Sequence, residues 1–421
     1  MRKLMDSGVK WLGEIPEGWE LVQLGSLFSE HKHKNIGLQS ENLLSLSYGN
    51  IIRKDIATTD GLLPENFEGY NVIDDGDIVL RLTDLQNDQR SLRVGLSHER
   101  GIVTSAYVTL RKRDASLNSQ FFYYLIHSYD VRKGFYGMGA GVRQGLNFTG
   151  IRKIMLTLPS SGEQRRIAIF LGEKTNQIDT LIANVQTQIE KLKSYKQSLI
   201  AEVVTRGMDP SAPMQDSGIE WLGKIPAHWK KIKHKSLFKN VSIKGHGNAT
   251  VLSLYRDYGI IPKDSREDNY NVTSMDTDSY KFVLPNDLVI NKMKAWSGSL
   301  AISDYEGIVS PAYYTCKINY QYVTKRFIHH YLRNKYLVGV YEMYSAGMRV
   351  GQWDLSIDDF LNIEIAIPPS LEEQELIATY LDKQCTTIDR LIDIKQRKID
   401  RLEEYKKTLV YEYVTGKKEV Q

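Results

Sequence analysis

The sequence DSGVKWLGEIPEGWELVQLGSLF at residues 6–28 returns as DSGIEWLGKIPAHWKKIKHKSLF at residues 216–238, with twelve of 23 positions identical. The shift of 210 residues holds far downstream, where Gln164 matches Gln374 and Asp179 matches Asp389. The chain of 421 residues is therefore two copies of one unit. A repeat this long indicates a duplicated domain, because solenoid repeats are far shorter. Two similar surfaces on one chain suit a twofold ligand such as duplex DNA.

Composition excludes several classes of protein. Hydrophobic residues make up 42% of the chain and charged residues 25%, which is typical of a globular protein. The net charge of +4 does not by itself indicate a nucleic-acid binder. The two cysteines, Cys316 and Cys385, both lie in the second copy, which argues against a disulfide framework and fits a reducing cytosol. We expect no signal peptide and no membrane helix, because no stretch approaches the roughly 18 apolar residues required.

The first part of each copy reads as a mixed α/β domain. The matched segments are two apolar strands, an aromatic helix, a glycine-rich loop and a strand with period-two alternation. In the two copies these are residues 76–83 and 286–293, 101–111 and 307–317, 120–128 and 325–334, 137–145 and 345–353, and 154–159 and 363–368. The sequences between these segments diverge, which predicts related folds that recognise different ligands.

The second part of each copy reads as one long helix. From Glu163 to Arg206 there is no proline and one glycine, and about 44 residues at 1.5 Å each would span roughly 66 Å. A 3-4 spacing of apolar residues predicts a coiled-coil seam between the two helices, which would run antiparallel if the copies are twofold related. The predicted seam contains Leu171, Ile178, Leu181, Val185, Leu192 and Tyr195 in the first copy, with Leu381, Ile388, Leu391, Leu402, Tyr405 and Leu409 in the second. Intermolecular coiled-coil segments of an oligomer are the alternative.

The combination of motifs resembles the specificity subunit of type I restriction–modification enzymes. Each copy opens with DSGxxWLGxIPxxW, and each helix opens in a proline and glutamate-glutamine segment, LPSSGEQRRIAIFL and IPPSLEEQELIATYL. The resemblance covers essentially the whole chain. It implies an α/β (α+β) fold of two duplicated target-recognition domains, separated by two long antiparallel coiled-coil helices with pseudo-twofold symmetry. The implied boundaries are recognition domains at residues 1–160 and 208–369, and spacer helices at residues 161–207 and 370–421.

Three strings imitate catalytic motifs. FYGMG at residues 135–139 fits a methyltransferase cofactor loop, but its preceding buried strand and its partner motif are missing. GIEWLGK at residues 218–224 imitates a phosphate-binding loop, but Ile225 replaces the required Ser or Thr. Asp287 with Asn291 and Lys292 hints at a nuclease site that lacks its second acid. The histidines show no ligand spacing, so we expect neither a catalytic residue nor a metal site.

The glycine-rich loops carry the best candidates for reading DNA bases. Direct readout uses Arg, Lys, Asn or Gln side chains held against base edges. The loops offer Arg143 with Gln144 in the first copy, and Arg349 with Gln352 in the second. Weaker candidates are Arg81 and Lys292 near strand ends, with Lys294 and Trp296. A solvated loop is the alternative for each residue alone.

The sequence therefore predicts a non-catalytic DNA specificity subunit that reads a bipartite target, one half-site per domain. By resemblance, its partners are double-stranded DNA, two methyltransferase subunits docked on the helices, and restriction–translocase subunits. The chain itself should bind no cofactor, with S-adenosylmethionine, ATP and Mg²⁺ expected only in the partner subunits. The resemblance also implies a cytoplasmic location in a prokaryote. A duplicated protein-binding scaffold is the alternative function, and a stand-alone methyltransferase is disfavoured by the missing motifs.

Overall fold

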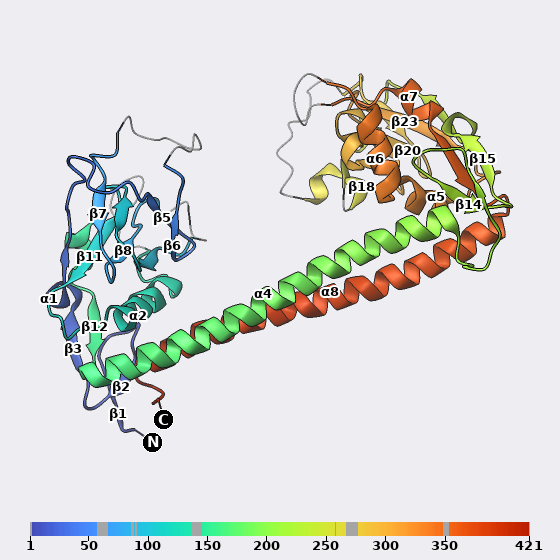
Figure 1. Cartoon of the computed structure of the whole chain (residues 1–421). Coiled ribbons are helices and arrows are strands. Elements are labelled where there is room, and N and C mark those ends of the chain that lie inside the picture. Colours follow the sequence, from blue (N-terminus) through green and yellow to red (C-terminus); the bar gives the residue numbers. More distant parts are fainter. Residues whose placement is uncertain are drawn as a thin grey trace. The chain divides into compact units, whose positions relative to one another are not determined.

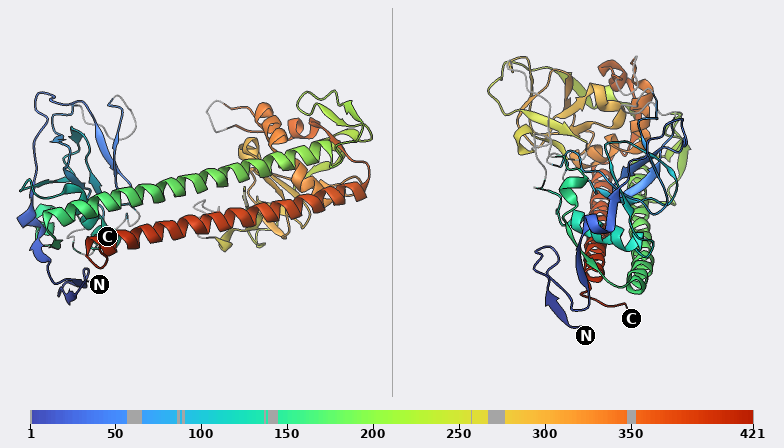
Figure 2. Two further views of the ribbon diagram at one scale, coloured as in Figure 1. Left: turned by 60° about the horizontal axis from the view of Figure 1, so that its bottom comes forward. Right: turned by 90° about the vertical axis from the view of Figure 1, so that its left-hand side faces the viewer.

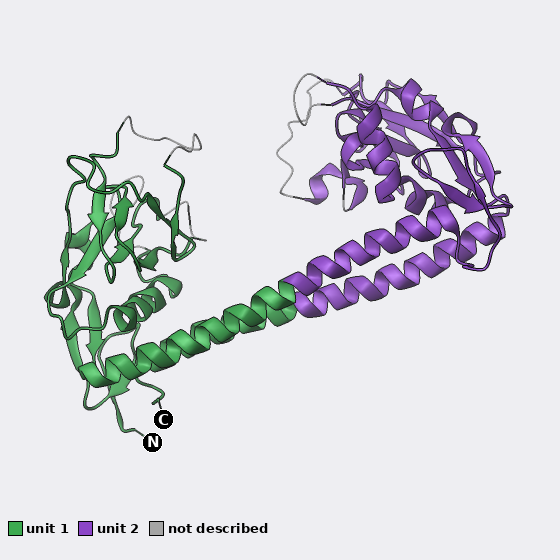
Figure 3. Cartoon of the chain, viewed as in Figure 1, with its two compact units in different colours: residues 1–186, 397–421 green, residues 187–396 purple. Residues whose placement is uncertain are grey.

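The computed structural model describes residues 2–56, 66–85, 88, 91–136, 138, 145–256, 258–266, 277–347 and 353–420. The chain divides into two compact units, residues 1–186 with 397–421, and residues 187–396 (Figure 3). Each unit contains one globular domain together with parts of both long helices. The units therefore do not follow the boundaries implied by the sequence, which stay predictions.

The first domain is built from short strands and small helices (Figure 1). Its elements are β1 (Leu4–Asp6), β2 (Glu14–Pro16), β3 (Glu20–Gln23), α1 (Leu24–Leu27), β4 (Phe28–Glu30), β5 (Leu44–Ser47), β6 (Asn50–Arg53), β7 (Asn71–Ile73), β8 (Ile78–Leu80), β9 (Val94–Leu96), β10 (Gly101–Val103), β11 (Val108–Lys112), α2 (Ser119–Val131), α3 (Phe148–Ile151) and β12 (Met155–Leu158).

The second domain repeats this order with small additions. Its elements are β13 (Met214–Asp216), β14 (Lys224–Pro226), β15 (Lys230–Lys233), η1 (His234–Ser236), β16 (Phe238–Val241), β17 (Leu252–Tyr255), β18 (Gly259–Pro262), η2 (Lys263–Ser265), β19 (Lys281–Val283), β20 (Leu288–Asn291), η3 (Lys292–Ser297), β21 (Leu300–Ile302), β22 (Gly307–Val309), β23 (Tyr313–Ile318), α5 (Lys325–Leu332), α6 (Lys335–Tyr344), α7 (Ile357–Asn362) and β24 (Glu364–Ile367).

The two domains share one sheet topology. A four-stranded antiparallel sheet has the order β4-β11-β8-β9 in the first domain and β16-β23-β20-β21 in the second. The central strands β8 and β20 are buried throughout, as expected for short apolar runs with both faces covered. Residues 101–111 and 307–317, predicted as one strand each, are split by a turn into β10 and β11, and into β22 and β23.

The long helices are α4 (Ser161–Arg206) and α8 (Leu371–Val414). In unit 1 they run antiparallel, with Lys406 Nζ 2.7 Å from Asp179 and the rings of Phe170 and Tyr413 4.5 Å apart. In unit 2 they are also antiparallel, with Lys196 Nζ 2.7 Å from Asp389 (Figure 2). The second ion pair is the first one with the roles of the two copies exchanged. The predicted fold class, duplicated mixed α/β domains with long antiparallel helices, is confirmed.

The helix seam differs in part from the predicted one. Leu171, Ile178, Val185, Leu381, Ile388 and Leu409 are buried, and Leu192 and Leu402 are partly buried. The prediction is wrong for four residues whose side chains are exposed: Leu181, Tyr195, Leu391 and Tyr405. An α-helix turns by about 100° per residue. A side chain three positions after Ile178 therefore points about 60° to one side of the direction of Ile178. A side chain four positions after it points about 40° to the other side, which is closer to the seam. The seam uses that second position, because Ile189 is buried and Ile182 is partly buried.

Each helix ends on the opening motif of a domain in its own unit. Gly416 follows α8 with φ 73°, and a Cβ there would lie 2.4 Å from Pro16 Cγ. Gly207 follows α4 with φ 78° and lies against Pro226 and Trp229. Both glycines take the left-handed conformation common after helices. The WLGxIPxxW sequence of each copy therefore forms a platform for a helix end, which explains why it is repeated. Within the described residues, none of the helices has the length and apolar character that a bilayer crossing needs.

Candidate nucleic-acid interface

In the first domain, the connection from β8 to β9 carries one predicted contact residue. Arg81 N donates to Arg93 O at 2.9 Å, which closes the base of this loop, called loop 81–93 below. The Arg81 side chain is 37% exposed, and its guanidinium lies 3.9 Å from Asp88. The position suits contact with a ligand, because an arginine held by a rigid strand end costs little to order.

The glycine-rich segment of the first domain begins and ends beside loop 81–93. Leu146 N, just after the segment, donates to Leu82 O at 2.8 Å. Tyr136, just before it, donates its hydroxyl to Asp88 O at 3.3 Å. The residues on either side of the glycine-rich segment, far from loop 81–93 in sequence, therefore both contact that loop. The predicted base-reading residues Arg143 and Gln144 lie outside the described residues.

The second domain builds the corresponding surface differently. Lys292 and Lys294 lie on η3, which directly follows β20. Leu355 N donates to Lys292 O at 3.1 Å, the counterpart of the contact between Leu146 and Leu82. Lys292 Nζ lies 3.0 Å from Asp354, and this hydrogen bond raises the pKa of the lysine. Arg349 and Gln352, the other predicted residues, lie outside the described residues.

Aromatic residues line the second surface. The rings of Trp296 and Trp353 meet edge to face at 5.5 Å, and both side chains are partly exposed. Such rings can stack on bases or pack against sugars. The sequence pointed weakly to Trp296 and missed Trp353, although its place at the end of the glycine-rich segment could have suggested it.

Backbone hydrogen bonds show which positions of the two loops correspond. Asn291 N donates to Ser299 O at 3.0 Å, as Arg81 N does to Arg93 O, so Asn291 is the counterpart of Arg81. Lys292 in turn corresponds to Leu82. The two predicted strand-end residues, Arg81 and Lys292, are therefore neighbours in register rather than equivalents. One frame presents different side chains in each domain.

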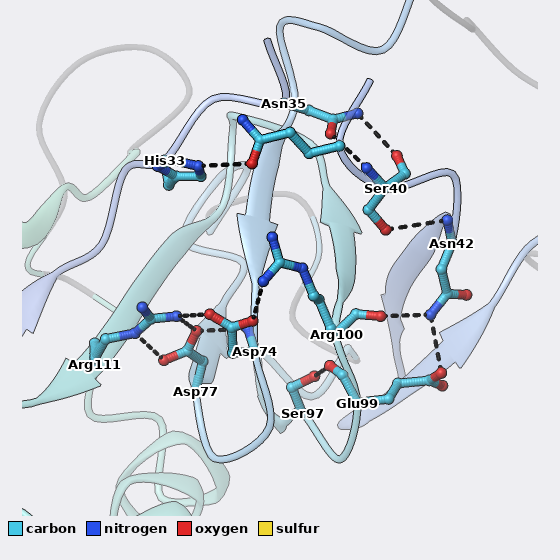
Figure 4. Close-up of polar contacts among 11 residues, drawn as sticks. His33, Asn35, Ser40, Asn42, Asp74, Asp77, Ser97, Glu99, Arg100 and Arg111 are labelled. Carbon is cyan, nitrogen blue, oxygen red and sulfur yellow. Dashed lines mark hydrogen bonds and ion pairs between the residues drawn. The ribbon is translucent and has the colours of Figure 1, made fainter. Parts of the chain in front are cut away.

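A polar cluster in the first domain suggests a different function at first sight. Arg111 donates to Asp77 at 2.8 Å and to Asp74 at 2.7 Å, and Arg100 also approaches Asp74 (Figure 4). Burial and the Arg111 charge lower the pKa of His31, whose ring nitrogen lies within 4.8 Å of both carboxylates. Three such donors could hold a metal ion. His31 lies more than 40 residues before the two aspartates, so nothing in the sequence pointed to this grouping.

The guanidinium of Arg111 is already hydrogen-bonded to both carboxylates of this cluster. Its hydrogen bonds with Asp77, and then with Asp74, raise its pKa. The second domain repeats the pair, with Lys317 Nζ 2.8 Å from the nearly buried Asp287. Asp77 and Asp287 also accept backbone N–H groups in the same way, from Asp74 and Leu284, both at 2.9 Å. A contact kept in both domains is best explained as part of the frame.

Two α/β domains with basic loops on a shared frame, joined by antiparallel helices, define a duplicated recognition protein. The sequence family described as the type I restriction modification DNA specificity domain matches residues 16–191 and 226–404, and the chain belongs to this family. The resemblance drawn from the sequence is therefore confirmed. As a specificity subunit the chain is non-catalytic, and its partners are DNA and the other subunits of a type I complex.

Two proteins of Methanocaldococcus jannaschii resemble the whole chain. The type I restriction enzyme MjaVIII specificity subunit is 24% identical over 435 residues, covering 96% of this chain and 93% of that protein. A protein assigned as the MjaX specificity subunit is 23% identical over 426 residues, covering 96% and 95%. A chain from a structural study of the assembly and conformational transition of a type I R-M system has a TM-score of 0.67, 15% identity, and coverage of 95% and 98%. That last likeness concerns the fold alone.

Proposed function

We propose that the chain recognises a bipartite DNA sequence, with one half-site read by each domain. The observation that carries this proposal is the recurring two-loop surface. In both domains a loop after the central strand meets the end of the glycine-rich segment through one equivalent backbone hydrogen bond. The side chains that this frame presents differ, with Arg81 in one domain and Lys292, Trp296 and Trp353 in the other. Shared frames with different surfaces suit two different short sequences.

The helix pairs would dock two copies of a methyltransferase subunit. Leu181 and Tyr405 are exposed in unit 1, and their repeats Leu391 and Tyr195 are exposed in unit 2. Each lies three residues after a seam residue, so helix geometry turns all four to the same angular side. When two helices pack antiparallel, residues at the same angular side of each helix share one face of the pair. Leu181 and Tyr405 therefore lie near each other, on the face opposite the Asp179–Lys406 ion pair. An exposed Leu-Tyr pair that occurs twice suits a partner that binds twice.

Under this proposal the chemistry belongs to the partner subunits. S-adenosylmethionine would bind in the methyltransferase subunits, and ATP with Mg²⁺ in restriction–translocase subunits. This chain would contribute the target sequence and the attachment points.

The bipartite target can be tested with a randomised duplex library. The purified chain, mixed with its methyltransferase partner, should enrich a motif split by a gap of fixed length. Arg81→Ala should relax one half of the motif and Lys292→Ala the other, since each lost base contact costs about 1–3 kcal/mol. Enrichment of no motif would favour the scaffold alternative.

Docking can be tested separately by titrating the chain with the methyltransferase subunit. The double variant Leu181→Ala with Tyr405→Ala should remove one of two binding events and leave the other. The matched control, Asp179→Ala with Lys406→Ala, changes the opposite face of the same helix pair and should keep both events. Two unchanged binding events in the first variant would exclude this face.

A further inference from the structure

Arg93 is a charged residue with no exposed surface, at the point where loop 81–93 enters β9. It is the largest fully buried side chain among the described residues. Arginine is almost never buried completely unless all of its donors are satisfied. Its backbone N–H donates to Asp130 Oδ2 at 2.6 Å. Its side chain, however, faces the loop.

The Arg93 guanidinium serves as a template for the loop backbone. Its Nε donates to Tyr136 Oη at 3.0 Å, and its Nη1 donates to Arg81 O at 3.2 Å and to Thr83 O at 2.7 Å. Its Nη2 donates to Asp84 O at 3.3 Å and also to Asp88 O. A guanidinium has five N–H donors in a rigid planar fork, and here each one has an acceptor. Four of the five acceptors are backbone carbonyls of this single loop.

The same side chain connects the loop to the start of the glycine-rich segment. Tyr136, which accepts from Arg93, immediately precedes that segment and donates to Asp88 O. The Arg93 guanidinium also lies 5.4 Å from the centre of the Tyr136 ring, where a cation interacts favourably with the aromatic face. Loop 81–93 and Tyr136 are therefore both held by one residue whose side chain is fully buried.

The second domain reaches a defined loop without such a residue. Ser299 stands at the position of Arg93, as the equivalent hydrogen bonds of Asn291 and Arg81 show. The η3 turn closes itself through Gly298 N, which donates to Ala295 O at 2.7 Å, with Gly298 at φ 81°. Trp296 Nε1 donates to Met293 O at 3.1 Å within the same turn. A loss at Arg93 should therefore affect one domain only.

We infer that Arg93 is a positioning residue for sequence recognition, which holds residues 81–84, Asp88 and Tyr136 in the conformation that reads the first half-site. It acts through Arg81 and its neighbours and does not contact DNA. This inference rests on the proposed function, in which each domain reads its own half-site. Lysine cannot replace Arg93, because one ammonium group with three donors cannot span five separated acceptors.

The test is target selection from a duplex library by the chain with its methyltransferase partner. Arg93→Lys should reduce discrimination at one or more positions of the first half-site by about tenfold or more, the size of a lost base contact. The second half-site provides the control within the same molecule, and its preferences should not change. Tyr136→Phe, which removes one acceptor and one donor but leaves the guanidinium in place, should give a smaller loss in the same half-site.

Arg111→Lys is the matched control in the same domain. Arg111 is also a hydrogen-bonded arginine, but its partners are carboxylates rather than carbonyls, and the second domain has Lys317 at this position. This variant should keep both half-site preferences. Arg93→Lys and Tyr136→Phe variants that bind with unchanged first half-site preferences would overturn the inference, as would an equal loss in both halves. A wild-type chain that selects no motif would instead overturn the proposed function.

Discussion

The junction between domain and helix is built twice in this chain, and the two junctions agree only in part. In unit 1, the Gln164 amide accepts from Asn118 N at 3.0 Å and donates to Pro159 O at 2.8 Å. In unit 2, Gln374 accepts from Thr324 N at 2.8 Å and donates to Pro368 O at 2.9 Å. These buried contacts, which join α2 to α4 and α5 to α8, are the same in both copies.

Away from these amides the junctions differ in chemistry. Unit 1 has a neutral hydrogen bond of 3.2 Å between Tyr124 and Thr175. Unit 2 has an ionic network in which Asp382 lies 2.6 Å from Arg326 and 2.7 Å from His330. The comparison teaches that buried backbone N–H and C=O groups keep the same hydrogen-bond partner in both copies, because each such group must be paired. Pairs of side chains on the same helices tolerate several solutions, since the pair is buried and neutral in unit 1 and partly exposed and ionic in unit 2.

The largest effect should come from removing the shared amides. Gln374→Ala leaves Thr324 N, Pro368 O and also Tyr322 O, 2.9 Å from its Nε2, without their partner. Each orphaned buried group costs about 1–3 kcal/mol, so we expect unit 2 to lose about 3–5 kcal/mol. Gln164→Ala breaks two bonds and should cost unit 1 about 2–4 kcal/mol. Hydrogen exchange of α5 and α2 amides measures both.

The control for these variants is Gln177→Ala, an exposed glutamine on α4. It should change stability by less than about 0.5 kcal/mol. If Gln374→Ala and Gln164→Ala were equally mild, the amides would not hold the junctions, and the agreement between copies would need another cause.

The next largest effect is a loss of stability in acid, which we expect from one buried position that is a histidine only in the second domain. Leu24 and His234 are equivalent, since their backbone N–H groups donate to Ile154 O and Ile363 O, and neither side chain is exposed. Burial lowers the pKa of His234 from 6.5 to about 3. A lowered histidine pKa means that the folded state favours the neutral ring. The contribution of His234 to folding stability is therefore complete above pH 6.5 and declines as the pH falls toward 3.

At pH 4.5 the contribution of His234 to the stability of unit 2 should be about 3 kcal/mol lower than at neutral pH, because two pH units separate this value from the ordinary pKa. His234→Leu, which copies the first domain, should remove that loss. Unfolding followed by hydrogen exchange at both pH values measures the difference. His98→Leu, at an exposed histidine, is the control and should leave the acid sensitivity unchanged. A His234→Leu variant that is as acid-sensitive as wild type would contradict the assignment.

The smallest effect should separate the ionic junction from the neutral one. Burial favours the protonated form of Asp382, but hydrogen bonds from His330 and Arg326 outweigh it, and the pKa of this carboxyl is lowered. Asp382→Asn should destabilise unit 2 by about 1 kcal/mol at low salt and by less at 1 M salt, because the pair is partly exposed. Thr175→Val removes one neutral bond and should cost unit 1 about 1 kcal/mol at either salt concentration. If the destabilisation by Asp382→Asn and that by Thr175→Val depended equally on salt, the two junctions would not differ in ionic character.

The sequence predicted the frame well because the frame is periodic and repeated. Apolar runs located β8 and β20, and the absence of proline between Glu163 and Arg206 located α4 within a few residues. It failed where three-dimensional geometry chooses between close alternatives. Leu181 and Ile182 are both apolar and adjacent, and only the angle around the helix excludes Leu181 from the seam. The turn that separates β10 from β11 lies at residues 104–107, TSAY, which contain neither the glycine nor the proline that usually marks a turn.

The candidate interface was less predictable than the fold. The sequence selected Arg81, Lys292 and Lys294 as basic residues near strand ends, and their reading roles stay predictions. It could not show that Leu82 meets Leu146, because that contact joins segments more than 60 residues apart. Nothing in the sequence around Arg93 marks it as buried, since complete burial of arginine is rare. Its role depends on carbonyls that only the folded loop brings together.

The ending of α8 on the opening motif of the chain has a topological consequence. Tyr411 Oη donates to Trp11 O at 3.2 Å and to Leu12 O at 3.0 Å, so the last helix meets the first motif without a peptide connection. The end of α4 packs with Ile219 and Trp229 in the same manner, but there residues 207–215 connect the two covalently. In each unit, therefore, a helix end packs on an opening motif, and in unit 2 a short segment of chain also connects the two. Joining residue 420 to residue 2 and opening the chain near Ser211 would exchange the order of the copies while keeping both contacts between a helix end and an opening motif.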